Sequence, residues 1–343
     1  MIYLMRMTES THLANPAKGS RTRAWFLLFR PWSYAATLVP FLTAAGLCAR
    51  WADNRWGYWA LGLFSGLLFQ STVNLLNTWG DEKSGVDGVP GAICTTPQVR
   101  DGLVSLDAVL AVGLVCAFLA CTVGCALCFY RASDGWHLNL PLLVAGFVGF
   151  LGSTNYSTGV KFKYHGLGVP FVSFLMGPLE IFVAFALLNP VFAREILRML
   201  VFPPFLLGAA LLTLPIAALV GVIMHGNDMR DIPTDRAAGI VTLASRLGPR
   251  GALRYYRICH ILPYGVTICL IAFSCFRHGI FTWTVSWFWL PLLALPLSVR
   301  TMSVATKVYR SRPENPPWRR LERASGGIHL LFGTLYALAF ALA

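Results

Sequence analysis

Charged side chains are scarce in this sequence, and acidic ones are scarcer than basic ones. Only 13% of the 343 residues are charged, against 56% that are hydrophobic, and Asp and Glu together number 15. A water-soluble domain of this length does not need so much apolar surface. Runs of 18 or more mostly apolar residues recur along the chain, and about 20 helical residues span the hydrocarbon core of a bilayer. The composition therefore predicts a polytopic membrane protein and excludes a soluble one.

Other absences narrow the class of protein further. Residues 1–23 are polar and basic and contain no apolar core, so we expect no cleavable signal peptide. Cys125 and Cys128 form a CxxC pair inside an apolar run with no second pair, which favours small buried side chains over a metal site. The net charge of +13 comes from Lys and Arg that flank the apolar runs, so it indicates membrane topology and no nucleic-acid partner.

Nine membrane-spanning helices are predicted, which gives an all-α fold. Their ranges are 31–49, 58–78, 103–130, 138–156, 168–189, 203–225, 258–276, 283–300 and 325–342. With this count, 22 of the 28 Lys and Arg fall on the side of the N-terminus, which the positive-inside rule makes cytoplasmic. We expect a basic cytoplasmic tail at residues 1–24 and one membrane domain at 25–343. The compartment is the Golgi or endoplasmic reticulum for a eukaryotic source and the inner membrane for a bacterial one.

The few acids are concentrated in two stretches that share one spacing. Each has polar residues at offsets 0, 3 and 7: Asn74, Asn77 and Asp81 in the first, and Asp228, Asp231 and Asp235 in the second. These offsets fall on one face of an α-helix. A single copy is typical of a solvated helix end. Two matching copies, each just past an apolar run and both on the predicted cytoplasmic side, indicate a site.

The residue types of this site indicate its chemistry. Anions on one face repel one another, and a bound cation would offset that repulsion. Oxygen ligands without His or Cys in register favour Mg²⁺ or Ca²⁺ over Zn²⁺. A metal between carboxylates and phosphate, with Lys and Arg on the remaining oxygens, is the usual way for an acidic site to bind a phosphate ester. A polar site that backs onto a membrane-buried cavity matches a prenyl diphosphate, with its charged head and apolar tail.

The chain resembles the UbiA superfamily of intramembrane prenyltransferases over about residues 25–342, and within it the MenA branch. The resemblance rests on Arg30-Pro31-Trp32-Ser33, Asn74-x2-Asn77-Thr78-x2-Asp81-x3-Gly85-x-Asp87, Gly159-x-Lys161-Phe162-Lys163-Tyr164, Gly177-Pro178-Leu179 and Asn227-x3-Asp231-x3-Asp235-Arg236-x2-Gly239-Ile240-Val241-Thr242-Leu243. It implies a helical bundle with a lateral opening for the isoprenoid tail. The implied reaction is Mg²⁺-dependent transfer of a polyprenyl group, which we expect to be geranylgeranyl, to dihydroxynaphthoate or menadione in menaquinone (vitamin K2) biosynthesis.

The resemblance also implies residue roles. The metal ligands would be Asn77, Asp81, Asp87, Asp228, Asp231 and Asp235. The diphosphate would be bound by Asn74, Asn77, Lys161, Lys163 and Arg236. Residues expected to act in catalysis are Asp81, Asp231, Lys163 and Tyr156, the last with its ring toward the allylic cation.

Several alternatives remain open at the level of sequence. Tyr156 is equally typical of an aromatic anchor at the membrane interface. Lys161 and Lys163 could instead be basic residues that flank a membrane span. Arg236 could instead form an ion pair with a neighbouring Asp. Glu180, alone in an apolar run, is either functional or a hydrogen-bonded neutral acid.

The function also has rival readings. Residues 86–98 contain no Lys or Arg, unlike the corresponding loop in most relatives, so donor affinity or lid closure could differ. The rival functions are prenyl transfer to another acceptor, such as 4-hydroxybenzoate, homogentisate or a haem side chain, and a non-catalytic prenyl-lipid sensor or transporter with a regulatory membrane-protein partner.

Overall fold

The computed structural model describes residues 20–83, 96–156, 159–199, 202–237, 239–278, 287–311 and 318–343. Within these ranges the chain is nearly all helical. One exception to the predicted all-α class is a short antiparallel hairpin, β1 (Phe129–Ala132) with β2 (Gly135–Leu138). Most of the predicted tail, residues 1–19, and the predicted metal ligand Asp87 lie outside the described residues.

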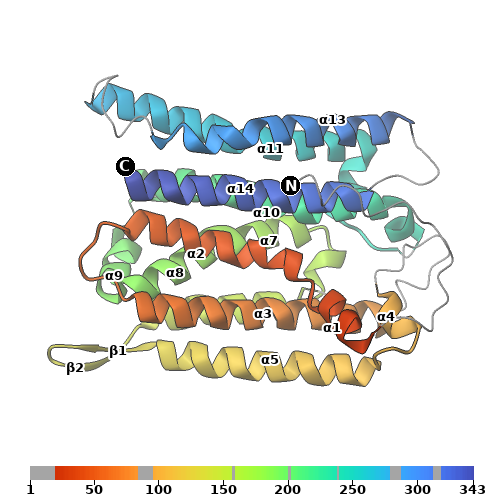
Figure 1. Cartoon of the computed structure of the whole chain (residues 1–343), viewed down its shortest axis with the longest axis horizontal. Coiled ribbons are helices and arrows are strands. Elements are labelled where there is room, and N and C mark those ends of the chain that lie inside the picture. Colours follow the sequence, from red (N-terminus) through yellow and green to blue (C-terminus); the bar gives the residue numbers. More distant parts are fainter. Residues whose placement is uncertain are drawn as a thin grey trace.

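The helical elements run in an alternating up-and-down path. In chain order they are α1 (Arg21–Phe29), η3 (Pro31–Tyr34), α2 (Ala35–Cys48), α3 (Trp56–Lys83), α4 (Pro97–Arg100), α5 (Leu106–Leu127), α6 (Leu140–Thr154), η5 (Phe162–Tyr164), α7 (Gly168–Phe174), the π-helical η6 (Leu175–Leu179), α8 (Glu180–Leu188), α9 (Pro190–Met199), α10 (Pro203–Ala237), α11 (Leu243–His278), η7 (Leu290–Ala294), α13 (Leu295–Ser311) and α14 (Trp318–Leu342). The long helices lie side by side (Figure 1), with α1 and α4 at one end of the bundle and α9 and the hairpin at the other.

Six of the described helices are long and apolar enough to cross a membrane. These are the segments Trp56–Lys83, Leu106–Leu127, Gly168–Leu188, Pro203–Pro233, Leu243–Phe276 and Leu321–Leu342. The predicted count of nine is therefore not confirmed. Two of the other predicted spans contain short helices, with 14 residues in α2 and 15 in α6, and the third, 283–300, lies partly outside the described residues.

The two helices that carry the acidic motifs are longer than predicted. The helix expected at 58–78 extends over Trp56–Lys83, and the one expected at 203–225 extends over Pro203–Ala237. Intrinsic propensity is a weak preference that packing overrides, so Asn, Asp and Thr continue a helix whose earlier turns are packed. The motifs therefore occupy the last turns of α3 and α10, where offsets of 0, 3 and 7 share one face.

Close packing between η6 and α10 fixes the position of the second motif's helix. A Cβ atom added at Gly177 would lie 2.8 Å from Cβ of Ala217 and 2.9 Å from its Cα. These separations are shorter than van der Waals contact, so only glycine lets the two segments approach this closely. This contact gives a structural reason for the Gly-Pro-Leu motif that sequence analysis singled out.

Replacing this glycine should destabilise the bundle. We expect Gly177→Ala to lower the free energy of unfolding by about 1–3 kcal/mol, because α10 must shift to admit a methyl group. Gly208→Ala is the matched control on α10, since a Cβ there meets no atom within 4 Å. Thermal unfolding in one detergent measures both. Equal melting temperatures for the two variants would contradict the packing role.

Candidate active site

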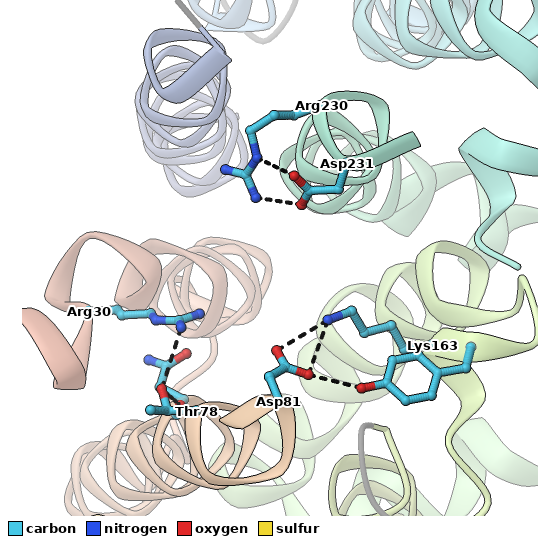
Figure 2. Close-up of polar contacts among 8 residues, drawn as sticks. Arg30, Thr78, Asp81, Lys163, Arg230 and Asp231 are labelled. Carbon is cyan, nitrogen blue, oxygen red and sulfur yellow. Dashed lines mark hydrogen bonds and ion pairs between the residues drawn. The ribbon is translucent and has the colours of Figure 1, made fainter. Parts of the chain in front are cut away.

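Asp81, in the last turn of α3, is the best-connected acid of the first motif. Its carboxylate lies 3.3 Å from Nζ of Lys163 and accepts a hydrogen bond from the hydroxyl of Tyr164 at 3.0 Å. Lys163 and Tyr164 belong to η5, so the predicted Gly159-to-Tyr164 motif folds onto the first acidic motif (Figure 2). The sequence analysis named Lys163 for this site but assigned no role to Tyr164.

The segment after α10 is fastened to the same loop. The backbone N–H of Val241 donates to the carbonyl of Tyr164 at 3.3 Å, and His165 and Val241 form a β-bridge. Gly239 provides the turn out of α10 with a φ of 71°, a value that glycine adopts without steric cost. The glycine four residues beyond Asp235 thus returns the chain to the loop that contacts Asp81.

Lys163 connects the two acidic motifs. Burial alone would lower the pKa of its ammonium group, but Asp81, Tyr156, Tyr164 and Asp228 act in the opposite direction, and the net result is a raised pKa. The lysine therefore stays charged at neutral pH. Asp81 on α3 and Asp228 on α10 both act on this one ammonium group, so Lys163 lies near both motifs.

Tyr156 is buried beside this lysine, with 5% of its surface exposed. Burial raises the pKa of its phenol, and the charges of Asp228, Lys163 and Asp81 all act on it. The side chain is therefore part of the polar site. Its burial argues against the alternative that the sequence left open, an aromatic anchor at the membrane interface.

The second motif divides into two buried acids and one partly exposed acid. Asp228 and Asp235 are 7% and 6% exposed. Asp231 instead accepts two hydrogen bonds of 2.6 Å from the guanidinium of Arg230, which also lies 3.9 Å from Glu322 of α14. Figure 2 shows this pair opposite Asp81 and Lys163. Arg230 was not predicted from the sequence, although a basic residue beside a motif carboxylate was a visible signal.

Asp235 lies beyond the apolar part of α10 and has an unusual environment. Burial, and then the charge of Asp231, raise its pKa to about 6, while Lys163 and a hydrogen bond from Thr242 at 3.3 Å oppose the shift. Burial and repulsion both make this carboxyl group costly to ionise, and a bound cation would offset that cost. Its oxygen atoms, with those of the other motif acids, form a donor set that fits Mg²⁺. Among the described residues, however, no three His, Cys, Asp or Glu side chains already lie at metal-binding spacing.

The other predicted diphosphate ligands differ in their surroundings. Asn77 is half-buried and its side chain has no hydrogen-bond partner among the described residues. Lys161 is exposed, with Nζ 5.6 Å from the centre of the Tyr164 ring. Arg236 is exposed and donates to the carbonyl of Ser245 at 3.2 Å, and no ion pair with a neighbouring Asp is present in the described part of the chain.

Asn74 has its amide nitrogen committed inside the chain. It donates to the carbonyl of Phe29 at 2.8 Å and to the hydroxyl of Ser33 at 2.9 Å, which ties α3 to the end of α1 and to η3. Arg30, between these two partners, reaches Thr78 at 3.4 Å (Figure 2). The Arg-Pro-Trp-Ser motif thus contacts the first acidic motif through Asn74 and Thr78.

Asn74 and Asn77 should therefore respond differently to substitution. We expect Asn74→Ala to lower the free energy of unfolding by about 1–3 kcal/mol, because a partly buried backbone carbonyl loses its donor. Asn77→Ala, one turn along the same helix, should leave stability unchanged. Chemical unfolding of both variants measures the difference. Unchanged stability of Asn74→Ala, together with lost diphosphate binding, would make Asn74 a substrate ligand instead.

A cavity of about 390 Å³ lies between α2, α3, α5, α6 and the η6–α8 segment, beside the turns of α3 that precede the polar site. On α3 it is lined by Gly62, Gly66, Phe69, Gln70 and Val73, at helical spacings of three and four. The same stripe continues through Asn77 to Asp81. At 1.5 Å per residue, Val73, the last lining residue on α3, lies about 12 Å from Asp81 along the helix axis. The lining is mostly apolar, so one face of α3 joins a charged site to a hydrocarbon-like cavity.

Comparison with known proteins identifies the family. The model of the UbiA prenyltransferase family matches residues 37–333. UbiA prenyltransferase domain-containing protein 1 of Homo sapiens is 28% identical over 336 residues, which cover 98% of this chain and 88% of the human protein. The Drosophila melanogaster homologue is 27% identical over 331 residues, covering 96% and 82%.

Solved structures share the fold. A UbiA homologue from Archaeoglobus fulgidus bound to GPP and Mg²⁺ superposes with a TM-score of 0.55 at 15% identity, over 93% of this chain and all of the other. An apo UbiA homologue from Aeropyrum pernix gives a TM-score of 0.51 at 14% identity, over 94% and 98%. The family match covers most of the chain and the resemblance inferred from the motifs is confirmed. The chain therefore belongs to the UbiA prenyltransferase family, as an integral membrane protein and an aromatic prenyltransferase.

Proposed function

We propose that this protein transfers a polyprenyl group, with geranylgeranyl as the first candidate, from its diphosphate to a naphthoquinone-type acceptor, dihydroxynaphthoate or menadione, in menaquinone biosynthesis. The observation that carries the proposal is the single face of α3, which runs from the apolar cavity up to Asp81 and Lys163. A donor with an apolar tail and an anionic head needs these two environments in this order. The amino-acid sequence of the second motif, from Asp235 to Leu243, supports an acceptor of the naphthoquinone type.

The residues would divide the work as follows. Asn77, Asp81, Asp228, Asp231 and Asp235 supply oxygen ligands for Mg²⁺ at the ends of α3 and α10, together with Asp87 outside the described residues. Bound Mg²⁺ supplies positive charge that stabilises the departing diphosphate.

Four cations and one ring complete the site. Lys163 and Arg230, which neutralise carboxylates of the two motifs here, are placed to bind phosphate oxygens, with the exposed Arg236 and Lys161 beside them. Asn74 holds the first motif in place. Tyr156, buried between the motifs, keeps water away and presents a ring to the allylic cation.

The proposal includes a membrane topology. The η3–α2 segment, α6 and the η7–α13 segment complete the six long helices to nine crossings, and both acidic motifs then face the cytoplasm. The Lys and Arg distribution supports this orientation. The compartment is the Golgi or endoplasmic reticulum in a eukaryote and the inner membrane in a bacterium.

Metal affinity should depend on pH through Asp235. A carboxyl group must lose its proton to bind a metal, and the pKa of this one is about 6. We therefore expect the affinity for Mg²⁺ to fall as the pH drops through about 6, measured as the Mg²⁺ concentration that half-maximally raises the melting temperature. Asp235→Asn should show a flatter profile. The same pH profile in both proteins would show that other groups govern the affinity.

Prenyl transfer in nanodiscs tests the reaction. Geranylgeranyl diphosphate is offered with dihydroxynaphthoate, menadiol, 4-hydroxybenzoate or homogentisate, in Mg²⁺ or in EDTA, and products are identified by mass spectrometry. We expect a Mg²⁺-dependent product from a naphthalene acceptor. Product from 4-hydroxybenzoate or homogentisate alone would assign another acceptor. Donor binding without any product would favour the sensor or transporter.

A further inference from the structure

Five polar side chains interrupt the apolar wall of the cavity: Thr37, Ser65, Gln70, Ser153 and Glu180. Three of them lie on different elements around one part of the wall. Glu180 opens α8, Gln70 comes from α3 and Thr37 comes from α2, and all three line the cavity. A methyl carbon of Thr37 lies 3.0 Å from the place where a Cβ of Gly66 would be. An oxygen of Glu180 lies 3.7 Å from the place where a Cβ of Gly66 would be, one helical turn from Gln70. Glu180 and Gln70 therefore line the same side of the cavity, about one turn of α3 apart.

Gln70 has an unused hydrogen-bonding atom. Its side-chain nitrogen donates weakly to the hydroxyl of Ser33 at 3.4 Å, whereas Oε1 is buried and has no partner among the described residues. Only 6% of the residue is exposed. A buried acceptor without a donor is costly, and native structures seldom keep one without a reason. A ligand that donates a hydrogen bond would remove that cost.

The carboxyl group of Glu180 complements this acceptor. It supplies oxygen atoms and, as the acid, one O–H donor. No Lys or Arg is present among the described residues that line the cavity, so no chain cation competes for it. Around the pair the lining is aromatic and aliphatic, with Phe41, Phe69 and Phe150 among its members. One hydroxyl group on an apolar body would match these surroundings.

This polar pair is too far from the diphosphate site to act on the reacting atoms. Gln70 precedes Asp81 by 11 residues, which is about 16 Å along α3. Reacting atoms must approach to about 3–3.5 Å. The pair therefore binds something other than the carbon that receives the prenyl group, and its role does not depend on the proposed reaction.

We propose that Glu180 and Gln70 form a binding site within the membrane for a hydroxyl-bearing apolar molecule, either a phenol or hydroquinone or an aliphatic lipid alcohol. The hydroxyl donates to Oε1 of Gln70 and accepts from Glu180, and the apolar body fills the rest of the cavity. Because the prenyl tail of the donor would enter the same cavity, such a ligand and the donor exclude one another.

Matched ligand pairs test the site in the full-length protein, in EDTA. The aromatic pair is 1-naphthol with 1-methoxynaphthalene, and the aliphatic pair is farnesol with farnesyl methyl ether. Binding is followed by ligand-dependent change in melting temperature. We expect wild type to prefer the hydroxyl over the ether by about tenfold in at least one pair, the ratio for one net hydrogen bond. The pair that shows the preference identifies the source of the ligand.

Variants locate the preference within the molecule. Glu180→Leu and Gln70→Leu should each abolish it, whereas Glu180→Gln, which keeps hydrogen-bonding groups, should retain part of it and guards against misfolding of the leucine variants. Asp81→Asn should leave it intact. Equal binding of hydroxyl and ether to wild type would overturn the proposal. So would a preference that Asp81→Asn abolishes and Gln70→Leu preserves, because the hydroxyl would then lie at the diphosphate site.

Discussion

Asp81→Asn and Asp231→Asn should each slow Mg²⁺-dependent prenyl transfer by about 10²–10³-fold, the usual cost of removing one group that stabilises charge in a transition state. Each substitution keeps the size of the side chain and removes one negative charge from one motif. The ammonium group of Lys163 interacts with acids of both motifs. We therefore expect the site to need both motifs, so that neither can compensate for the loss of the other. The measurement is the initial rate with saturating donor.

A distant acid serves as the control for this pair. Asp53 is exposed between α2 and α3, at the opposite end of α3 from Asp81, so Asp53→Asn should retain the wild-type rate. A variant with wild-type activity at either Asp81 or Asp231 would show that its motif does not take part in transfer.

Lys163→Met should destabilise the metal-free protein. The substitution leaves Asp81 without its ammonium partner at 3.3 Å and removes the charge that also acts on Asp228. The pair is partly buried, with 23% and 15% of the two side chains exposed, so the cost lies between that of surface and buried ion pairs, at about 2 kcal/mol. Mg²⁺ should recover part of the loss, since a bound cation replaces the missing charge.

Lys161→Met is the matched control, because Lys161 lies two residues away and is exposed. It should leave the free energy of unfolding unchanged in EDTA and in Mg²⁺. Unfolding by denaturant, with and without Mg²⁺, measures all three proteins. If Lys163→Met loses the same free energy of unfolding with and without Mg²⁺, a bound cation does not replace the charge of Lys163.

The grouping of the two motifs could be predicted because it depends on local rules. Offsets of 3 and 7 share one helix face whatever the rest of the fold, and the distribution of Lys and Arg put both motifs on one side of the membrane. Lys163 lay in a motif quoted for the family, and the structure places it against Asp81. Periodicity predicted which acids share a helix face, whereas Lys163 came from the family resemblance.

Features that depend on contacts between distant segments could not be predicted. The hydrogen bonds of Asn74 to Phe29 and Ser33 depend on how α3 packs against η3, which spacing within α3 does not encode. The ends of α3 and α10 were placed too early because hydropathy falls before helical structure does. The predicted number of spans was not confirmed, because helices such as α6 are too short to count as membrane spans by length and composition.

Glu180 shows the limit of sequence reasoning most clearly. As a lone acid in an apolar run it was noticed, but its meaning depended on Gln70, which lies on another helix and drew no attention. Their meeting at one cavity wall is a tertiary feature, and so is the missing partner of the Gln70 acceptor.

Metal binding tests the central claim most directly, namely that the ends of α3 and α10 together hold a metal-bound diphosphate. Mn²⁺ in place of Mg²⁺ can be followed by electron paramagnetic resonance in the presence of a non-reactive thio analogue of geranylgeranyl diphosphate. We expect Mn²⁺ to bind wild type more tightly when the diphosphate is present, and Asp81→Asn and Asp231→Asn each to weaken that binding by more than tenfold. Wild-type affinity for Mn²⁺ in both variants would contradict the claim.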